Sequence, residues 1–404
     1  MENQLNASSL VALHQVISDR IAESPDQRIS FAEFMELALY HPQYGYYARN
    51  RSQLGFRGDF VTSVHLGNDF GELIAEQLAE IWCKLAYPNP FQLVEMGPGQ
   101  GLLADTILSH LQACYPDCLG AVRYALIEKS PALKRLQQLH LQAWCDQGVP
   151  LDWCELSDIP PDSITGCLFS NELIDAFPVH RVTLTDRGLR EDYVTNSNHK
   201  TRPFQLVNGP LSTEALTQYF ERSGIALSSP PYPMGFTTEV NLAALSWLES
   251  VARIFHRGYV MTIDYGYSAE RYYMPTRSQG TLQCYSRHAH HSDPLVNVGQ
   301  QDITAHVNFT ALERHGEQQG LETLGSLPQA LFLMALGLGD RLNELSRWQG
   351  TDGTTLTTAI RRREALHQLV NPMGLGKFNV LVQGKGLTTP SQRQLKGLTV
   401  PAQT

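Results

Sequence analysis

The sequence is short of basic residues. Its 404 residues include 31 lysines and arginines against 40 aspartates and glutamates, so the formal net charge is −9. A general nucleic-acid binder neutralises phosphates with clustered Lys and Arg. The charge balance therefore argues against nucleic acid as the partner of this protein.

Paired cysteines and long apolar runs are also missing. The seven cysteines are scattered and include no CxxC pair, a pattern typical of reduced thiols in a cytoplasm. The longest apolar run, residues 330–338, is about half the length of a membrane-spanning helix. The first residues lack the basic and apolar regions of a signal peptide. We therefore expect a cytoplasmic protein without membrane insertion, in which the 330–338 run lies in the core or on a dimer surface.

A histidine-rich stretch, His288, His290 and His291, has the residue type of a metal site but not its spacing. Three such close histidines need distant acidic ligands to complete a coordination sphere. We expect a solvated or acceptor-facing loop there, and no metal.

The centre of the chain alternates between strand and helix patterns. Strands are predicted at 91–96, 122–128, 151–154 and 166–170, with helices at 102–113 and from Ser130 onward, where Pro131 occupies the first turn. Such alternation indicates a parallel sheet with right-handed crossovers. A helix at 241–255 and strands at 259–264 and 378–383 continue the pattern.

The flanking regions suggest additions to this α/β core. Residues 1–90 are predicted to be mostly helical: Ser30 and Glu33 form a capping-box pattern, and apolar residues recur at helical spacing after Asp69. Residues 178–233 carry hairpin signals, including Asp186-Arg-Gly. We predict a Rossmann-like core from 91–177 and 234–404, an N-terminal helical region (1–90) that contributes to the cofactor site, and an inserted β-rich cap (178–233).

A glycine-rich loop, Glu95-Met-Gly-Pro-Gly-Gln-Gly101, joins the first predicted strand to its helix. Open α/β sheets bind ligands at this carboxyl edge, and glycines let the backbone approach the ligand closely. The dinucleotide fingerprint GxGxxG requires a glycine where this chain has Leu102, which disfavours a nicotinamide cofactor. The loop could also be an ordinary glycine turn beside surface acids.

The acidic residues around the loop favour S-adenosylmethionine (SAM). A nicotinamide dinucleotide brings a pyrophosphate to a helix N-terminus, whereas SAM brings an ammonium, a carboxylate and a sulfonium. The Glu95 carboxylate suits the cationic end of SAM. Glu128, at the tip of the second strand, is placed to accept both ribose hydroxyls.

Several further blocks make the chain resemble the MidA-like methyltransferases, a family that includes the mitochondrial complex I assembly methyltransferase. Besides the glycine loop, they are Tyr44-Gly-Tyr-Tyr, Gly58-Asp-Phe-Val-Thr-Ser, Phe70-Gly-Glu, Asn171-Glu-Leu-Ile-Asp-Ala-Phe-Pro-Val-His, Ile263-Asp-Tyr-Gly, Gln301-Asp-Ile-Thr-Ala-His-Val-Asn-Phe and Asn371-Pro-Met-Gly-Leu-Gly-Lys-Phe-Asn. The resemblance implies a class I SAM-methyltransferase fold and, for the mitochondrial relative, methylation of an arginine on a complex I subunit. Where family members often carry Ser-Pro-Glu, this chain has Ser63, Val64 and His65, which puts any role of that acid in doubt.

Glu172 and Asp175 are the candidate catalytic residues. An arginine acceptor is cationic, and a carboxylate pair can grip its guanidinium and leave one nitrogen more nucleophilic. If residues 172–175 are helical, the two acids share a face. Glu172 would then be the main acceptor clamp and Asp175 its partner; the alternatives are that Glu172 only orients the cofactor loop and that Asp175 is structural.

The remaining candidates surround the cofactor and the acceptor. Gly58 and Asp59 are expected to fold over the cofactor as a lid, and Glu155 to border the adenine. The full cofactor-binding set is Gly58, Asp59, Glu95, Gly97, Pro98, Gly99, Gly101, Glu128, Glu155 and Asn171. Asp302 and His306 could line the acceptor channel or serve only in buried hydrogen bonds.

These expectations lead to a SAM-dependent methyltransferase that modifies an arginine on a protein, with a subunit of a complex I-like or NDH-type complex as the candidate substrate, and that could form a homodimer. Three other functions stay open at this stage. They are a non-catalytic assembly chaperone that binds SAM as a structural ligand, a small-molecule methyltransferase, and, disfavoured by Leu102, a nicotinamide-dependent oxidoreductase.

Overall fold

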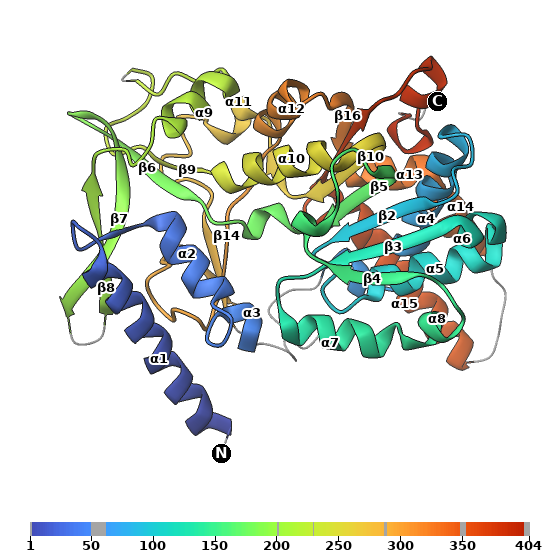
Figure 1. Cartoon of the computed structure of the whole chain (residues 1–404), viewed down its shortest axis with the longest axis horizontal. Helices are drawn as coiled ribbons and strands as arrows, with labels where there is room; N and C mark the ends of the chain where they lie inside the picture. Colours follow the sequence, from blue (N-terminus) through green and yellow to red (C-terminus); the bar gives the residue numbers. More distant parts are fainter. Residues whose placement is uncertain are drawn as a thin grey trace.

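The chain folds into two lobes, which meet at the carboxyl ends of the strands of a large sheet (Figure 1). The computed structural model describes residues 2–49, 62–199, 202–228, 230–286, 289–347 and 353–399. One lobe carries a seven-stranded sheet, and the other carries smaller sheets together with the first helices of the chain.

The seven-stranded sheet confirms the predicted α/β architecture. Its strands lie in the order β16 (Glu322–Pro328), β17 (Asn379–Lys385), β10 (Phe255–Asp264), β5 (Ile164–Asn171), β2 (Phe91–Met96), β3 (Val122–Ile127) and β4 (Leu151–Cys154). β17 departs from the predicted parallel arrangement, because it runs antiparallel to both β10 and β16. β16 ends and β17 begins at the same edge of the sheet, where Pro328 is paired with Asn379, so the two strands run in opposite directions.

Helices cover both faces of this sheet, and successive strand residues point alternately into the two layers. Leu93 belongs to one buried cluster and Val94 to the other. The first layer contains α4 (Asn68–Lys84), α5 (Leu102–Cys114), α13 (Gln329–Leu336) and α15 (Gly353–Val370). The second contains α10 (Leu242–Ile254) and α12 (Phe309–Gln318). Shorter helices α6 (Pro116–Ala121), α7 (Pro131–His140), α8 (Gln142–Asp146) and α14 (Leu338–Arg347) complete the lobe.

Several local predictions are confirmed. The Ser30 and Ser130 side chains accept hydrogen bonds from backbone N–H groups in the first turns of α2 (Phe31–Tyr40) and α7. The apolar run at 330–338 lies mainly in the core, since Phe332, Leu333, Leu336 and Leu338 are buried. Leu331 and Met334 remain exposed on the same stretch.

The second lobe is built on a five-stranded sheet. It consists of β1 (Ile29–Ser30), β7 (Gly188–His199), β6 (His180–Thr185) and β9 (Thr237–Val240) in that order, with β8 (Arg202–Gly209) paired to β7. The predicted hairpin at Asp186 is the β6–β7 turn. Because β1 and β9 lie outside residues 178–233, this sheet draws on more of the chain than the predicted cap, whereas α4, within the predicted N-terminal region, packs on the large sheet.

Further elements belong to neither of the two main sheets. They are α1 (Glu2–Glu23), α3 (Tyr46–Arg49), α9 (Ala215–Ser223), α11 (Ala269–Tyr272), the three-stranded sheet β13 (Ala289–His291)–β12 (Gln283–Ser286)–β14 (Asp302–Thr304) and the pair β11 (Gly266–Tyr267)–β15 (Val307–Asn308). Residues of α1, α2, β7, β8, β12 and β14 share one buried cluster that includes Leu13, Phe34, Val194, Phe204 and Ile303.

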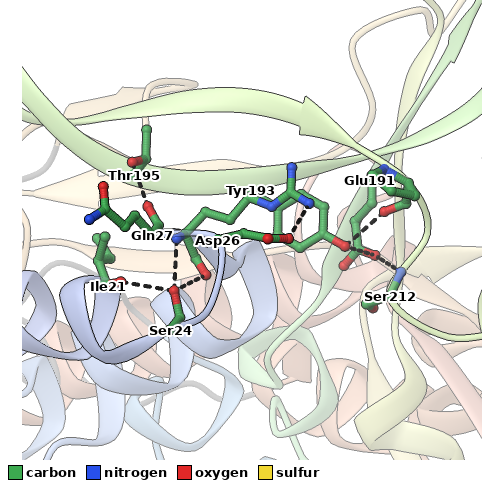
Figure 2. Close-up of polar contacts among 10 residues, drawn as sticks. Ile21, Ser24, Asp26, Gln27, Glu191, Tyr193, Thr195 and Ser212 are labelled. Carbon is green, nitrogen blue, oxygen red and sulfur yellow. Dashed lines mark hydrogen bonds and ion pairs between the residues drawn. The ribbon is translucent and has the colours of Figure 1, made fainter.

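Polar contacts join the segment after α1 to the long strand β7 (Figure 2). The Thr195 hydroxyl donates to the Gln27 carbonyl at 2.7 Å, and the Arg28 guanidinium lies 4.3 Å from the centre of the Tyr193 ring. Further along, the Glu191 carboxylate accepts from the Ser212 N–H at 2.6 Å. The first two contacts tie the segment between α1 and β1 to β7, and the third ties β7 to the segment after β8.

Candidate active site

A cavity of about 680 Å³ lies at the carboxyl edge of the large sheet, where the second lobe covers it. Its walls come from the segments that follow β2, β3, β4 and β5, from α2 and α3, and from Tyr265 and Asp302. Ligand pockets for small molecules and cofactors typically measure roughly 300–1,000 Å³. The cavity therefore has the size and the place in the fold that a cofactor site requires.

The glycine loop forms one wall of this cavity, and its backbone requires glycine. Gly97, Gly99 and Gly101 have φ values of 68°, 55° and 81°, in the left-handed region that other residues adopt at a cost. A Cβ on Gly97 would lie 2.8 Å from Leu173 Cδ1. Gly99 and Pro98 line the cavity, and a Cβ at Gly99 would meet no protein atom within 4 Å.

Gln137, on α7, ties the loop to the end of β3 and was missed by sequence reasoning. Its buried amide donates to the Gly99 carbonyl at 2.8 Å and to Glu128 Oε2 at 3.2 Å, and it accepts from the Trp153 indole at 3.0 Å. A polar residue on the inner face of a predicted helix was the available signal. The three contacts fix the spacing between the glycine loop and Glu128.

Glu95 is a buried acid rather than a surface one. The Tyr124 hydroxyl donates to Glu95 Oε2 at 2.7 Å, and burial raises the pKa of Glu95 to about 7. Because Glu95 also lines the cavity, a cationic ligand group nearby would favour its ionised form.

Glu128 follows β3, as predicted, and lines the cavity. Its Oε1 accepts from the Ser130 N–H at 2.7 Å, and burial raises its pKa to about 7. Each carboxylate oxygen has two lone pairs, so both can also accept from a vicinal diol. Glu155 follows β4 and lines the cavity, where it is exposed and caps the short 3-10 helix η2 (Leu156–Asp158).

The segment after β5 brings Asn171, Glu172 and Asp175 to the cavity, but not on a shared helix face. Glu172 has a left-handed φ of 52°, and only Ile174–Ala176 form a 3-10 turn, η3. The helical interpretation of 172–175 is therefore wrong. The physical reason is Asp264, at the end of β10, whose Oδ2 accepts from the N–H groups of Leu173, Ile174 and Asp175 and so fixes a tight turn.

Burial raises the pKa of both acids. Burial, together with Asp175, raises the pKa of Glu172 to about 8, and burial raises the pKa of Asp175 to about 6. The Tyr265 hydroxyl donates to Asp175 Oδ2 at 2.6 Å. Asp175 Oδ1 and Asn171 Oδ1 are enclosed and have no hydrogen-bond partner within the described part of the chain.

The remaining predicted residues fall in three groups. Gly58 and Asp59 lie outside the described residues, so the predicted lid is not placed. Asp302 lines the cavity, where it accepts from the Tyr47 hydroxyl, whereas His306 stacks on Tyr267 and is not among the lining residues. His290 and His291 lie on β13, and His288 lies outside the described residues.

The block where family members carry Ser-Pro-Glu also reaches the cavity. Its residues form the 3-10 helix η1 (Ser63–His65), and Val64 and His65 line the wall. His65 Nδ1 lies 2.8 Å from Thr62 Oγ1, and burial lowers the pKa of His65. A neutral histidine thus stands where the resemblance leads one to expect an acid.

Comparison with known proteins identifies the family. The model of a family of S-adenosyl-L-methionine-dependent methyltransferases matches residues 73–327. The chain belongs to this family. The crystal structure of a Burkholderia thailandensis protein bound to S-adenosyl-homocysteine is similar to this methyltransferase at a TM-score of 0.82 and 29% identity, over 97% of this chain and 95% of that one.

Curated relatives match over most of this methyltransferase. The protein arginine methyltransferase NDUFAF7 homolog, mitochondrial, of Drosophila melanogaster is 30% identical over 78% of this chain and 73% of that protein. The protein arginine methyltransferase NDUFAF7, mitochondrial, of Homo sapiens is 28% identical over 78% of this chain and 72% of that protein.

The cavity residues fit SAM. The open space at Gly99 leaves room for the ligand to approach the backbone, Glu128 suits the ribose hydroxyls, and Glu95 suits a cationic group. SAM supplies a methyl group on a sulfonium, a leaving-group arrangement that needs no covalent enzyme intermediate. The chain's part is to hold the acceptor in line with that methyl and to exclude water.

Replacing Gly99 by Ala should lower SAM affinity at least tenfold in calorimetric titration, because the new methyl group would enter the ligand's space. Gly148→Ala is the matched control, since Gly148 also has a left-handed φ (83°) and open space around its Cβ but does not line the cavity. Both changes should cost about 1–2 kcal/mol of stability. Equal SAM binding by the two variants would contradict the placement of the ligand.

Gln137→Leu should weaken SAM binding by about tenfold, because it leaves the Gly99 carbonyl and the Trp153 indole without their partner and releases Glu128. Gln142→Leu serves as control, since the Gln142 side chain donates to the exposed Asp146 side chain and does not line the cavity. A Gln137 variant that melts earlier yet binds SAM normally would show that the glutamine is merely structural.

The ligand-free protein should lose thermal stability as the pH rises from 6.5 to 8.5. The pKa values of Glu95, Glu128 and Glu172 are raised to about 7, 7 and 8, so the folded state keeps protons that the unfolded state has already released. Stability then falls as pH rises through this window. His306, whose pKa burial lowers to about 4, is neutral in the folded state throughout. A melting temperature that rises between pH 6.5 and 8.5 would contradict the assignment.

Proposed function

We propose that this methyltransferase transfers the methyl group of SAM to an arginine side chain of a protein. The observation that carries the proposal is the charge of the cavity's far end. Glu172, Asp175 and Asp302 line it, and Lys129, at the rim, is the one lysine or arginine among the described lining residues. A cationic acceptor matches that surplus of carboxylates.

The geometry supports a carboxylate clamp on a guanidinium. Glu172 and Asp175 lie on one tight turn, and Asp175 Oδ1 has no partner in the described structure. Fork-like binding of carboxylates holds a guanidinium in one plane and concentrates its positive charge on the bonded nitrogens. The nitrogen that forms the bond to the methyl carbon must lose a proton, since the acceptor is cationic before and after transfer. Glu172, whose pKa is raised to about 8 in the ligand-free protein, ionises when a cationic acceptor binds beside it, and its carboxylate can then take that proton.

The relatives' names support the same acceptor, because those of Drosophila melanogaster and Homo sapiens are named protein arginine methyltransferases. We extend the proposal, on the family resemblance of the sequence, to a subunit of a complex I-like or NDH-type complex as the substrate. A cytoplasmic location and a homodimer that uses the exposed Leu331 and Met334 are parts of the same proposal. Within the described residues, no helix is both long and apolar enough to cross a bilayer.

Glu172→Gln should abolish methyl transfer to an arginine-containing acceptor while SAM binding stays within about threefold of the wild type. Glu128→Gln should do the reverse, raising the KM for SAM tenfold or more and leaving acceptor binding unchanged, because Glu128 lies at the cofactor end. Methyl transfer is followed by mass spectrometry and SAM affinity by calorimetry. Full turnover by Glu172→Gln would exclude the clamp.

The same assay, applied to whole cell extract, separates the other candidate functions. Label from SAM that appears only in small molecules would identify a small-molecule methyltransferase. No label in any fraction, with normal SAM binding, would favour an assembly chaperone that keeps SAM as a structural ligand.

A further inference from the structure

The part of the cavity beyond the cofactor residues is lined by tyrosines as well as acids. Tyr40 ends α2, Tyr47 lies on α3, and their ring centres are 5.3 Å apart with a tilt of 32°. Both line the cavity together with Asp175 and Asp302. Three segments far apart in the sequence thus meet at one place: α2–α3, the turn after β5, and β14.

Hydrogen bonds hold these groups in place. The Tyr47 hydroxyl donates to both oxygens of Asp302, at 2.9 and 3.1 Å. The Tyr40 hydroxyl donates to the Ala176 carbonyl at 2.8 Å, and the Ala305 N–H donates to the Asp175 carbonyl at 2.9 Å. The second lobe therefore contacts the turn after β5 directly, and these hydrogen bonds set the positions of Asp302 and Asp175 relative to each other.

The negative charge around Tyr40 and Asp175 favours a cationic ligand in this part of the cavity. Tyr40 and four carboxylates, those of Asp302, Asp175, Glu36 and Glu128, line the same cavity. Burial raises the pKa of Tyr40 well above its ordinary value, and the negative charges of these four acids raise it further. Asp175 is 6% exposed, and its Oδ1 lacks a hydrogen-bond partner in the described chain. A buried carboxylate oxygen without a partner is costly unless a ligand satisfies it.

The Tyr40 ring already attracts a cation. The Lys129 ammonium lies 5.0 Å from the ring centre, and its ion pair with Glu36 is long, at 3.7 Å, with an exposed side chain. Exposed pairs of this kind contribute little to stability, so an incoming cation can displace the lysine at small cost.

We propose that Tyr40, Tyr47, Asp175 and Asp302 form a subsite for a planar, delocalised cation, which selects an arginine over a lysine acceptor. A guanidinium stacks on aromatic rings and offers several coplanar N–H donors to carboxylates on two sides, whereas an ammonium is a compact, strongly hydrated point charge. The proposal deepens the function proposed above and rests on it.

The test is binding to the protein loaded with S-adenosyl-homocysteine, measured by calorimetry with N-acetyl-arginine amide and N-acetyl-lysine amide. The wild type should bind the arginine compound at least tenfold more tightly. Asp302→Asn should lower arginine affinity by about tenfold and leave the affinity for S-adenosyl-homocysteine within threefold. Equal binding of the two amides by the wild type, or unchanged arginine binding by Asp302→Asn, would overturn the proposal.

Two variants separate the ring of Tyr40 from its hydroxyl. Tyr40→Phe keeps the aromatic face and should retain at least a third of the arginine affinity, whereas Tyr40→Leu should lose most of it. If Asp302→Asn does not fold, Tyr47→Phe replaces it, because it removes the donor that orients Asp302; its arginine affinity should fall severalfold. Tyr40→Leu or Tyr47→Phe proteins that bind arginine as the wild type does would refute the subsite.

The outcome is independent of catalysis. If the wild type binds arginine without methylating it, and Asp302→Asn no longer binds arginine, the subsite stands and the proposed acceptor fails. If arginine transfer occurs but Asp302→Asn binds and turns over like the wild type, the proposed function stands and the subsite is wrong.

Discussion

The cavity wall that carries Glu172 and Asp175 depends on one side chain. Asp264 accepts hydrogen bonds from three consecutive backbone N–H groups, those of Leu173, Ile174 and Asp175. Asp264 is fully buried at the end of β10, and burial raises its pKa well above the ordinary value. The three hydrogen bonds to Asp264 Oδ2 hold the chain after β5 in a tight turn. That turn places Glu172 and Asp175 in the cavity wall. Without it, neither carboxylate would have a defined position next to the methyl group.

Excess negative charge is the second constraint. Carboxylates buried at the edge of a sheet cost free energy when they ionise. The cavity holds several, and Lys129 is the one lysine or arginine among its described lining residues. A cationic sulfonium, an ammonium or a guanidinium offsets that cost, so the site favours the ligands that its reaction requires. Burial first, and the charge of Asp175 second, raise the pKa of Glu172 to about 8, so the ligand-free protein keeps a proton on Glu172 at neutral pH.

The two lobes divide the work between them. The seven-stranded sheet supplies the glycine loop, Glu128 and the acceptor turn, while the second lobe supplies Tyr40, Tyr47 and Asp302. Gln137 fixes the cofactor side and Tyr265 the acceptor side, each through hydrogen bonds to a carboxylate.

Local sequence determined the elements and the cofactor wall. Alternation of strands and helices, caps such as Ser30 and Ser130, and the glycine loop all depend on neighbours within a few residues. The sequence could therefore place Gly97, Gly99, Glu95 and Glu128 near the ends of two neighbouring strands, where they line the cavity. Tertiary structure alone decided the rest. Gln137, Tyr124 and Asp264 act through partners 9 to 91 positions away, and no local pattern records such a contact. The conditional helix at residues 172–175 fails for the same reason, because three of its backbone N–H groups donate instead to Asp264 on another strand.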